Sequence, residues 1–197
     1  MTTPKGLLLV LMEPPAGLEE EFNDWYDTEH LPQRRSLPGF QSGLRWTCVG
    51  GWPRWAALYD LASVAALDTP DYQAVSGPSS TPWSRRILPR TVGRSRIVAE
   101  QVLPGDASAR PVHDVSQLVL ARYRHAADAA ACAREAASLP GLMQVRMFCA
   151  AGPGPAEGWA VAEFDRPQSP DAVRGALGMV AGAGAAMLNL YVPYHRG

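Results

Sequence analysis

The sequence contains few cysteines, and their spacing excludes two common ways of stabilising a small protein. Only three occur in 197 residues, at Cys48, Cys132 and Cys149, and no two of them have the C-x-x-C spacing of a zinc or redox site. An odd number of widely spaced cysteines favours neither a disulfide framework nor a metal centre. We therefore expect reduced thiols and a cytoplasmic protein.

Neither sign of charge is in excess, because 18 Lys and Arg stand against 19 Asp and Glu, for a formal net charge of −1. Nucleic-acid binding usually requires a basic stripe, so we expect no such partner. The arginines between Arg85 and Arg96 are more typical of a strand and its loop than of a phosphate-reading surface. Long apolar runs are also missing. The run from Leu7 to Met12 is too short to span a membrane and predicts a β-strand, so we expect no membrane partner.

Several motifs that would indicate a cofactor or a nucleophile are absent as well. The sequence has no GxGxxG, no GxxxxGK[ST] and no GxSxG. Three histidines, His113, His125 and His195, are not spaced with a second histidine, a cysteine or a carboxylate as metal ligands would be. We predict no cofactor and no metal. Haem iron would need an axial ligand, for which His125 is a candidate.

What the sequence does contain is an internal echo. The string SLPGF at 36–40 is followed about a hundred residues later by SLPGL at 138–142, and WAALYD at 55–60 is followed by AVAEFD at 160–165. The two echoes occur in the same order and at nearly the same offset. A diverged tandem duplication explains this pattern. We place the two copies at 1–102 and 113–197, with a linker rich in Pro, Ala and Asp at 103–112.

Each copy is predicted to have the element order βαββαβ. In the first copy we expect strands at 6–12, 40–49, 55–61 and 92–102, and helices at 18–35 and from Ser63, as N-cap, to about 67. In the second we expect strands at 117–123, 143–150, 159–164 and 186–192, and helices at 127–138 and 170–180.

This order predicts an α+β protein made of two tandem ferredoxin-like repeats. Each repeat is an antiparallel sheet with helices on one face and a bare apolar face on the other. Two such sheets in one chain can cover each other and close into an αβ-barrel. We expect a small-molecule cavity between the two bare faces.

One segment of the first long helix gathers most of the chemistry-bearing side chains. It reads WYDTEHLP at 25–32 and is followed by LPGF at 37–40. On a helix, Tyr26 and His30 stand one turn apart, and Pro32 marks a disruption because it lacks an amide donor.

These strings resemble the EthD-like members of the dimeric αβ-barrel superfamily, whose first helix carries W-Y-x-x-E-H-x-P before a strand that opens with P-G-F. The matching residues here are Trp25, Tyr26, Glu29, His30, Pro32, Pro38, Gly39 and Phe40. The second copy is similar only through its Leu-Pro-Gly and its strand order. The resemblance therefore implies the fold and a one-sided site. Cofactor-free monooxygenases, polyketide cyclases, lactone isomerases and haem enzymes all occur in that superfamily, so the fold does not choose the reaction.

His30, Tyr26 and Glu29 are the candidate catalytic residues. His30 could act as general acid/base on a carbonyl-bearing substrate, with Tyr26 donating a hydrogen bond to the substrate oxygen. The competing interpretation makes His30 an ordinary helix end, where an imidazolium meets the helix dipole. Glu29 could orient His30, or it could form a structural ion pair with Arg45.

Four further residues are candidates for substrate binding. Arg45 and Gln41 share the polar face of the predicted second strand, where Arg45 could bind a carboxylate or enolate or could be a surface residue. Trp25 could be a platform for the substrate or part of the core. Trp83 lies in the loop predicted at 79–83 and could close over a ligand as a lid.

Together these features predict a cofactor-independent enzyme for a small aromatic or polyketide-like substrate. Its chemistry would be proton transfer leading to cyclisation, isomerisation or elimination, with His30 as acid/base. Two alternatives stay open: cofactor-free oxygenation of a substrate enolate, and a non-catalytic binding or scaffold protein. Convergence of Tyr26, Glu29, His30 and Arg45 on one cavity would favour an enzyme. The sequence also leaves open whether two chains pair as a homodimer.

Overall fold

A computed structural model describes residues 3–126, 128, 131, 134, 136–150, 156–180 and 183–196. Eight of its strands close into one antiparallel barrel, in the order β1-β3-β2-β10-β5-β7-β6-β4. The first half supplies β1 (Gly6–Glu13), β2 (Leu44–Gly50), β3 (Trp55–Leu61) and β4 (Val92–Leu103), and the second half supplies β5 (Gln117–Tyr123), β6 (Leu142–Ala150), β7 (Gly158–Phe164) and β10 (Met187–Pro193).

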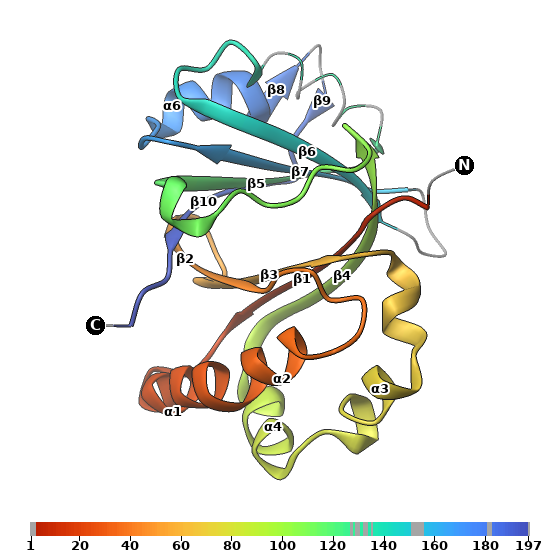
Figure 1. Cartoon of the computed structure of the whole chain (residues 1–197). Helices are drawn as coiled ribbons and strands as arrows, with labels where there is room; N and C mark the ends of the chain where they lie inside the picture. The colour runs from red at the N-terminus through yellow and green to blue at the C-terminus, as the bar shows by residue number, and fades with distance from the viewer. Residues whose placement is uncertain are drawn as a thin grey trace.

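The helices lie outside the barrel, and each group covers the half-sheet of its own half of the chain (Figure 1). Those of the first half are α1 (Glu19–Trp25), α2 (Leu31–Arg35), α3 (Pro70–Gln73) and α4 (Pro82–Ile87), and the second half has α6 (Pro170–Val173). Short 3₁₀ turns occupy Ala16–Leu18, Val64–Asp68, Gly77–Ser79, Leu88–Arg90 and Val112–Asp114, and β8 (Met179–Val180) pairs with β9 (Ala183–Gly184). The helix predicted at 127–138 lies largely outside the described residues.

Alternation along the strands produces three apolar layers. On β1, Leu7 and Leu9 point into the barrel, whereas Leu8 packs with the first-half helices. A third layer lies between the second half-sheet and its helices, around Val119 and Phe164. Because the two inner faces cover each other, the apolar inner face of each half-sheet is buried.

The boundaries of β3 and β5 match the prediction, and every other strand end except the start of β2 lies within one residue of its predicted position. The start of the second strand was wrong, since β2 begins at Leu44 rather than at Phe40, and Phe40 makes only an isolated bridge to Leu61. There the Ser42 hydroxyl accepts the Asp60 amide at 3.2 Å, which takes the place of a ladder hydrogen bond. Ser63 holds the predicted N-cap position of a short helix, which is the 3₁₀ turn Val64–Asp68, but its side chain makes no cap hydrogen bond. The Thr69 side chain does cap α3.

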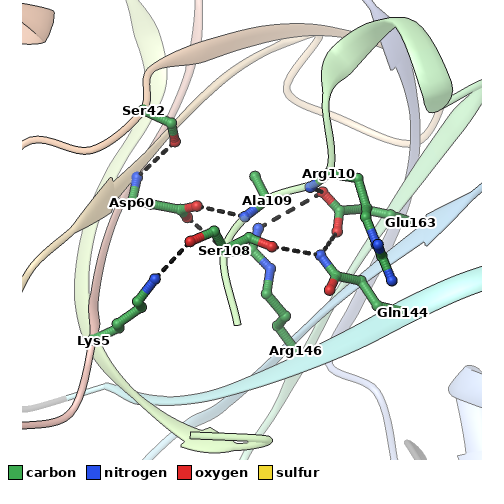
Figure 2. A network of polar contacts seen from close by, with 9 residues as sticks. All are labelled: Lys5, Ser42, Asp60, Ser108, Ala109, Arg110, Gln144, Arg146 and Glu163. Atoms are coloured by element: carbon green, nitrogen blue, oxygen red, sulfur yellow. Dashed lines mark hydrogen bonds and ion pairs between the residues drawn. The ribbon is translucent and has the colours of Figure 1, made fainter. Parts of the chain in front are cut away.

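The segment at 103–112 closes one end of the barrel through buried charges (Figure 2). Arg146 on β6 pairs with Asp60 on β3 at 2.7 Å, and Asp60 also accepts the Ala109 amide at 2.6 Å. Glu163 on β7 accepts the Arg110 amide at 3.2 Å. Burial raises the pKa of Glu163, and the Arg146 charge offsets part of that rise. Strands from both halves and the segment between them are thus held by one polar network.

Candidate functional site

A cavity with a volume of about 720 Å³ lies between the first half-sheet and the first-half helices. This overturns the expectation of a cavity between the two bare faces. The barrel interior is filled by large side chains from both half-sheets, among them Trp46, Phe148, Trp159 and Tyr191. The cavity has an apolar part formed by Leu8, Val10, Met12, Leu88 and Pro89, and a polar part formed by Tyr26, His30, Arg34, Tyr59, Tyr72, Ser76, Ser80, Ser84, Arg85, Arg94 and Arg96.

A local change in helix geometry presents Tyr26 and His30 to this cavity. Between α1 and α2, residues Tyr26–His30 form a π-helical turn, in which the Leu31 amide donates to the Tyr26 carbonyl five residues back. Pro32 has no amide to donate, and the wide turn before it lets the helix continue through Arg35. The predicted disruption at Pro32 is therefore a widened turn. It sets the Tyr26 and His30 rings edge to face, with centroids 5.2 Å apart.

His30 is held as a neutral imidazole. Its ring lies 4.4 Å from the Trp25 ring, and its Nδ1 atom is buried without a hydrogen-bond partner among the described residues. Burial, together with the positive charges of Arg34 and Arg45, lowers the pKa of His30 to about 3. The helix continues through Arg35, so His30 does not stand at a helix end. A neutral imidazole has a free lone pair and is a proton acceptor.

Two phenols accompany His30 in the wall. Tyr26 is 2% exposed, and burial raises its pKa, although the Arg45 charge acts in the opposite direction. Burial and the neighbouring Tyr26 raise the pKa of Tyr59 well above its usual value. The Tyr59 hydroxyl is buried, and the Tyr26 phenol is its polar neighbour. Both phenols therefore keep their protons at neutral pH and remain hydrogen-bond donors.

Arg34 extends the same helical stripe, four residues beyond His30. It is 6% exposed, and its guanidinium lies 5.1 Å from the centroid of the Tyr72 ring. Its Nη2 donates to the Val75 carbonyl at 2.9 Å, whereas Nη1 is buried and unpartnered among the described residues. Sequence reasoning missed Arg34, although the i, i+4, i+8 spacing of Tyr26, His30 and Arg34 was a signal that could have found it.

Glu29 and Arg45 lie outside the cavity wall. Glu29 accepts a hydrogen bond from Thr81 at 2.5 Å, and so ties the π-helical turn to the start of α4. Arg45 pairs with Asp27 at 2.6 Å, and its guanidinium lies 4.4 Å from the centroid of the Tyr26 ring. The expected pairs of Glu29 with His30 or Arg45 do not form, because Thr81 and Asp27 are the nearer partners. Arg45 acts on the site through its charge and by supporting Tyr26.

The three remaining candidates are not part of the wall either. Trp25 is fully buried, and its indole Nε1 donates to Ser84 at 3.1 Å. Trp83 is not in a lid loop but in α4, where its Nε1 donates to Glu21 at 3.1 Å. The sequence Thr81-Pro82 was the missed signal, since Thr is a favoured N-cap and Pro a favoured first helical residue. Gln41 is exposed and precedes β2.

Among the described residues, the second half offers no matching wall. Its layer between sheet and helix is packed, and the Tyr123 hydroxyl there donates to the Leu177 carbonyl at 2.5 Å. His125 follows β5 and is exposed, so among the described residues no histidine is placed as an axial ligand in that layer. These residues do not fit haem. No group of three or more His, Cys, Asp or Glu side chains within the described residues could hold a metal ion. The described helices include none long and apolar enough to cross a membrane.

No protein-family profile and no curated protein sequence matches the chain, but solved structures do. An anthrone oxidase-like protein superposes with a TM-score of 0.59 at 12% identity, over 98% of this chain and 92% of its own. A candidate monooxygenase from Fusobacterium nucleatum gives a TM-score of 0.57 at 10% identity, over 98% and 96%. Chlorite dismutase from Candidatus Nitrospira defluvii, in complex with imidazole, gives 0.58 at 9% identity, over 98% and 93%.

The chain has the dimeric αβ-barrel fold. These neighbours belong to that superfamily, and the likeness extends over nearly the whole chain. At identities of 12% or less, the superpositions establish the fold and leave the reaction to be argued from the site.

Proposed function

We propose that the chain is an enzyme that removes a carbon-bound proton from a small aromatic substrate in the first-half cavity, without a cofactor. The observation that carries this proposal is the neutral, buried His30 beside the protonated Tyr26 in one cavity. His30 would accept the proton, and Tyr26 would donate a hydrogen bond to the substrate oxygen on which the negative charge gathers.

The low pKa of His30 is compatible with this role because a substrate anion beside the imidazole would raise it. Burial and two positive neighbours depress it. An enolate or phenolate formed beside the imidazole adds a negative charge, which favours the imidazolium and raises its pKa. His30 is thus a weak base before the substrate arrives, and a stronger one as the substrate anion develops.

Direct reaction of that anion with oxygen is the outcome we favour. Two of the structural neighbours are an anthrone oxidase-like protein and a candidate monooxygenase. For a substrate of the anthrone type, a ring methylene and O₂ give a ring carbonyl and water, so atoms and electrons balance with no further reductant. The cavity volume of about 720 Å³ accommodates a three-ring aromatic compound.

The test uses anthrone as the probe, with oxygen uptake and quinone formation followed together. Wild type should accelerate both, and His30→Asn should lose about a hundredfold or more of the acceleration, the usual contribution of a general base. His113→Asn is the matched control, because that imidazole is 80% exposed and lies outside the cavity. Proton exchange without oxygen uptake would favour a cyclase or isomerase. Binding without either reaction would favour a non-catalytic binding protein.

We also infer that the two half-sheets are tandem ferredoxin-like repeats, the first of them EthD-like. The strand order is β4-β1-β3-β2 in the first half and, with equivalent strands in the same places, β10-β5-β7-β6 in the second. Both Leu-Pro-Gly strings end in a glycine with positive φ, 84° at Gly39 and 78° at Gly141. The Gly39 carbonyl accepts a hydrogen bond from the amide of Ala62, the residue after β3. The Gly141 carbonyl accepts the equivalent hydrogen bond from the amide of Asp165, the residue after β7. These matched turns support a duplication.

A further inference from the structure

The charge of the cavity wall points to the kind of substrate it accepts. Four arginines line the cavity, and its described lining includes no Asp or Glu. Arg34 reaches it from α2 and Arg85 from α4, while Arg94 and Arg96 both reach it from β4. Side chains from three separate elements therefore bring positive charge to one cavity.

None of these four arginines pairs with a carboxylate within the described residues. Arg34 donates to the Val75 carbonyl, Arg85 to the Ser80 carbonyl at 2.6 Å, and Arg96 to the Tyr72 hydroxyl at 3.2 Å. Arg34 is the one of the four that is buried, and the two other buried arginines among the described residues behave differently. Arg45 pairs with Asp27, and Arg146 pairs with Asp60.

An unpaired buried cation is costly, so this contrast suggests that its partner is not part of the chain. Arg34 is the decisive case, because it is 6% exposed and its Nη1 has no partner among the described residues. Burial lowers the pKa of Arg34, and the nearby Arg96 charge acts in the same direction. A bound anion would satisfy the free Nη1 and relieve the repulsion between the two guanidinium groups.

Tyr72 defines where that anion would sit. The Arg34 guanidinium lies over its ring, and Arg96 donates to its hydroxyl, so the two guanidinium groups flank one phenol. Planar guanidinium groups bind the two oxygens of a carboxylate side by side. The apolar part of the wall, formed by Leu8, Val10 and Met12, would hold the rest of a ring system.

We propose that the substrate of this cavity is an aromatic carboxylic acid, with its carboxylate held between Arg34 and Arg96. This deepens the proposed function, on which it rests. Arg94 and Arg85 add positive charge around this position. The negative charge of the bound carboxylate also raises the pKa of His30, which makes its neutral imidazole a stronger base.

The experiment compares two probes of equal shape, anthraquinone-2-carboxylate and anthraquinone-2-carboxamide, by calorimetric titration of the full chain. The carboxylate should bind about tenfold tighter or more, as expected for charge-assisted hydrogen bonds. Arg34→Met and Arg96→Met should each remove most of this preference, whereas Arg90→Met should keep it. Arg90 is exposed and outside the cavity wall. Arg96 is exposed, so Arg96→Met tests the proposal even where Arg34→Met fails to fold.

Two further arms separate this inference from the proposed function and from general anion binding. His30→Asn should keep the preference for the carboxylate, because binding does not need the base. If His30→Asn loses turnover but still prefers the carboxylate probe, the result bears on the proposed reaction and leaves the proposed carboxylate site standing. Equal affinity for the two probes in wild type would overturn the inference. Equal competition by inorganic phosphate and by benzoate at the same concentration would also overturn it, because the site would then be a general anion site.

Discussion

The neutral state of His30 in the folded protein predicts a specific dependence of stability on pH. In the unfolded chain this histidine has an ordinary pKa of about 6.5, whereas in the folded chain its pKa is about 3. Between these two values the unfolded state binds a proton that the folded state does not. The free energy of unfolding must therefore fall as pH falls through this window, and this loss is absent above about pH 7.

The expected size follows from the two pKa values. At pH 5 the linkage amounts to about 2 kcal/mol for His30 alone, against almost nothing at pH 7.5. His30→Asn keeps a polar side chain of similar reach but cannot titrate in this range. Between pH 7.5 and pH 5, wild type should therefore lose about 2 kcal/mol more than this variant.

Urea unfolding followed by tryptophan fluorescence measures this difference. Burial raises the pKa of Glu163, which also contributes to the pH dependence, but this contribution is common to both proteins and cancels in the comparison. His113→Asn should follow wild type at every pH, because that imidazole is exposed. Parallel stability curves for wild type and His30→Asn would refute the reasoning, since they would mean that His30 titrates normally in the folded chain.

Two predictions concern residues that support the site and the barrel. The Thr81 hydroxyl accepts the Ser84 amide hydrogen bond that caps α4, and it donates to Glu29. Thr81→Ala removes both hydrogen bonds and should lower the free energy of unfolding in urea by about 1 to 2 kcal/mol. An unchanged urea midpoint would mean that the cap is not needed. Arg146→Met leaves Asp60 and Glu163 buried without their cation, and should cost about 3 to 5 kcal/mol at pH 7 by the same assay. A cost below about 1 kcal/mol would show that water solvates these carboxylates.

The strands and the Tyr26–His30 pair could be predicted from the sequence because they depend on local patterns. Alternation locates β5 between Gln117 and Tyr123, and helical spacing puts Tyr26 next to His30. The side of the half-sheet on which the cavity forms could not be predicted in this way. It depends on Trp46 and Trp159, which lie far apart in sequence and fill the barrel interior together.

The partners of charged side chains were equally out of reach. Arg45 could have met Glu29 or a ligand, and only the fold shows that Asp27 is its partner. Arg34 was not singled out from the sequence, because a positive charge near a helix end is common. Its burial without a carboxylate depends on the tertiary structure. The assignment of Trp83 to a loop was wrong for a local reason, because Thr81 and Pro82 mark the start of the helix that contains it.

The central claim is that His30 removes a proton from carbon, and hydrogen–deuterium exchange of the anthrone methylene tests it most directly. Under nitrogen in D₂O, NMR follows the loss of the methylene signal with no contribution from the oxygen step. Wild type and His113→Asn should accelerate the exchange well above the buffer rate, and His30→Asn should return it close to that rate. Equal acceleration by wild type and His30→Asn would contradict the account, because the proton would then be removed without His30.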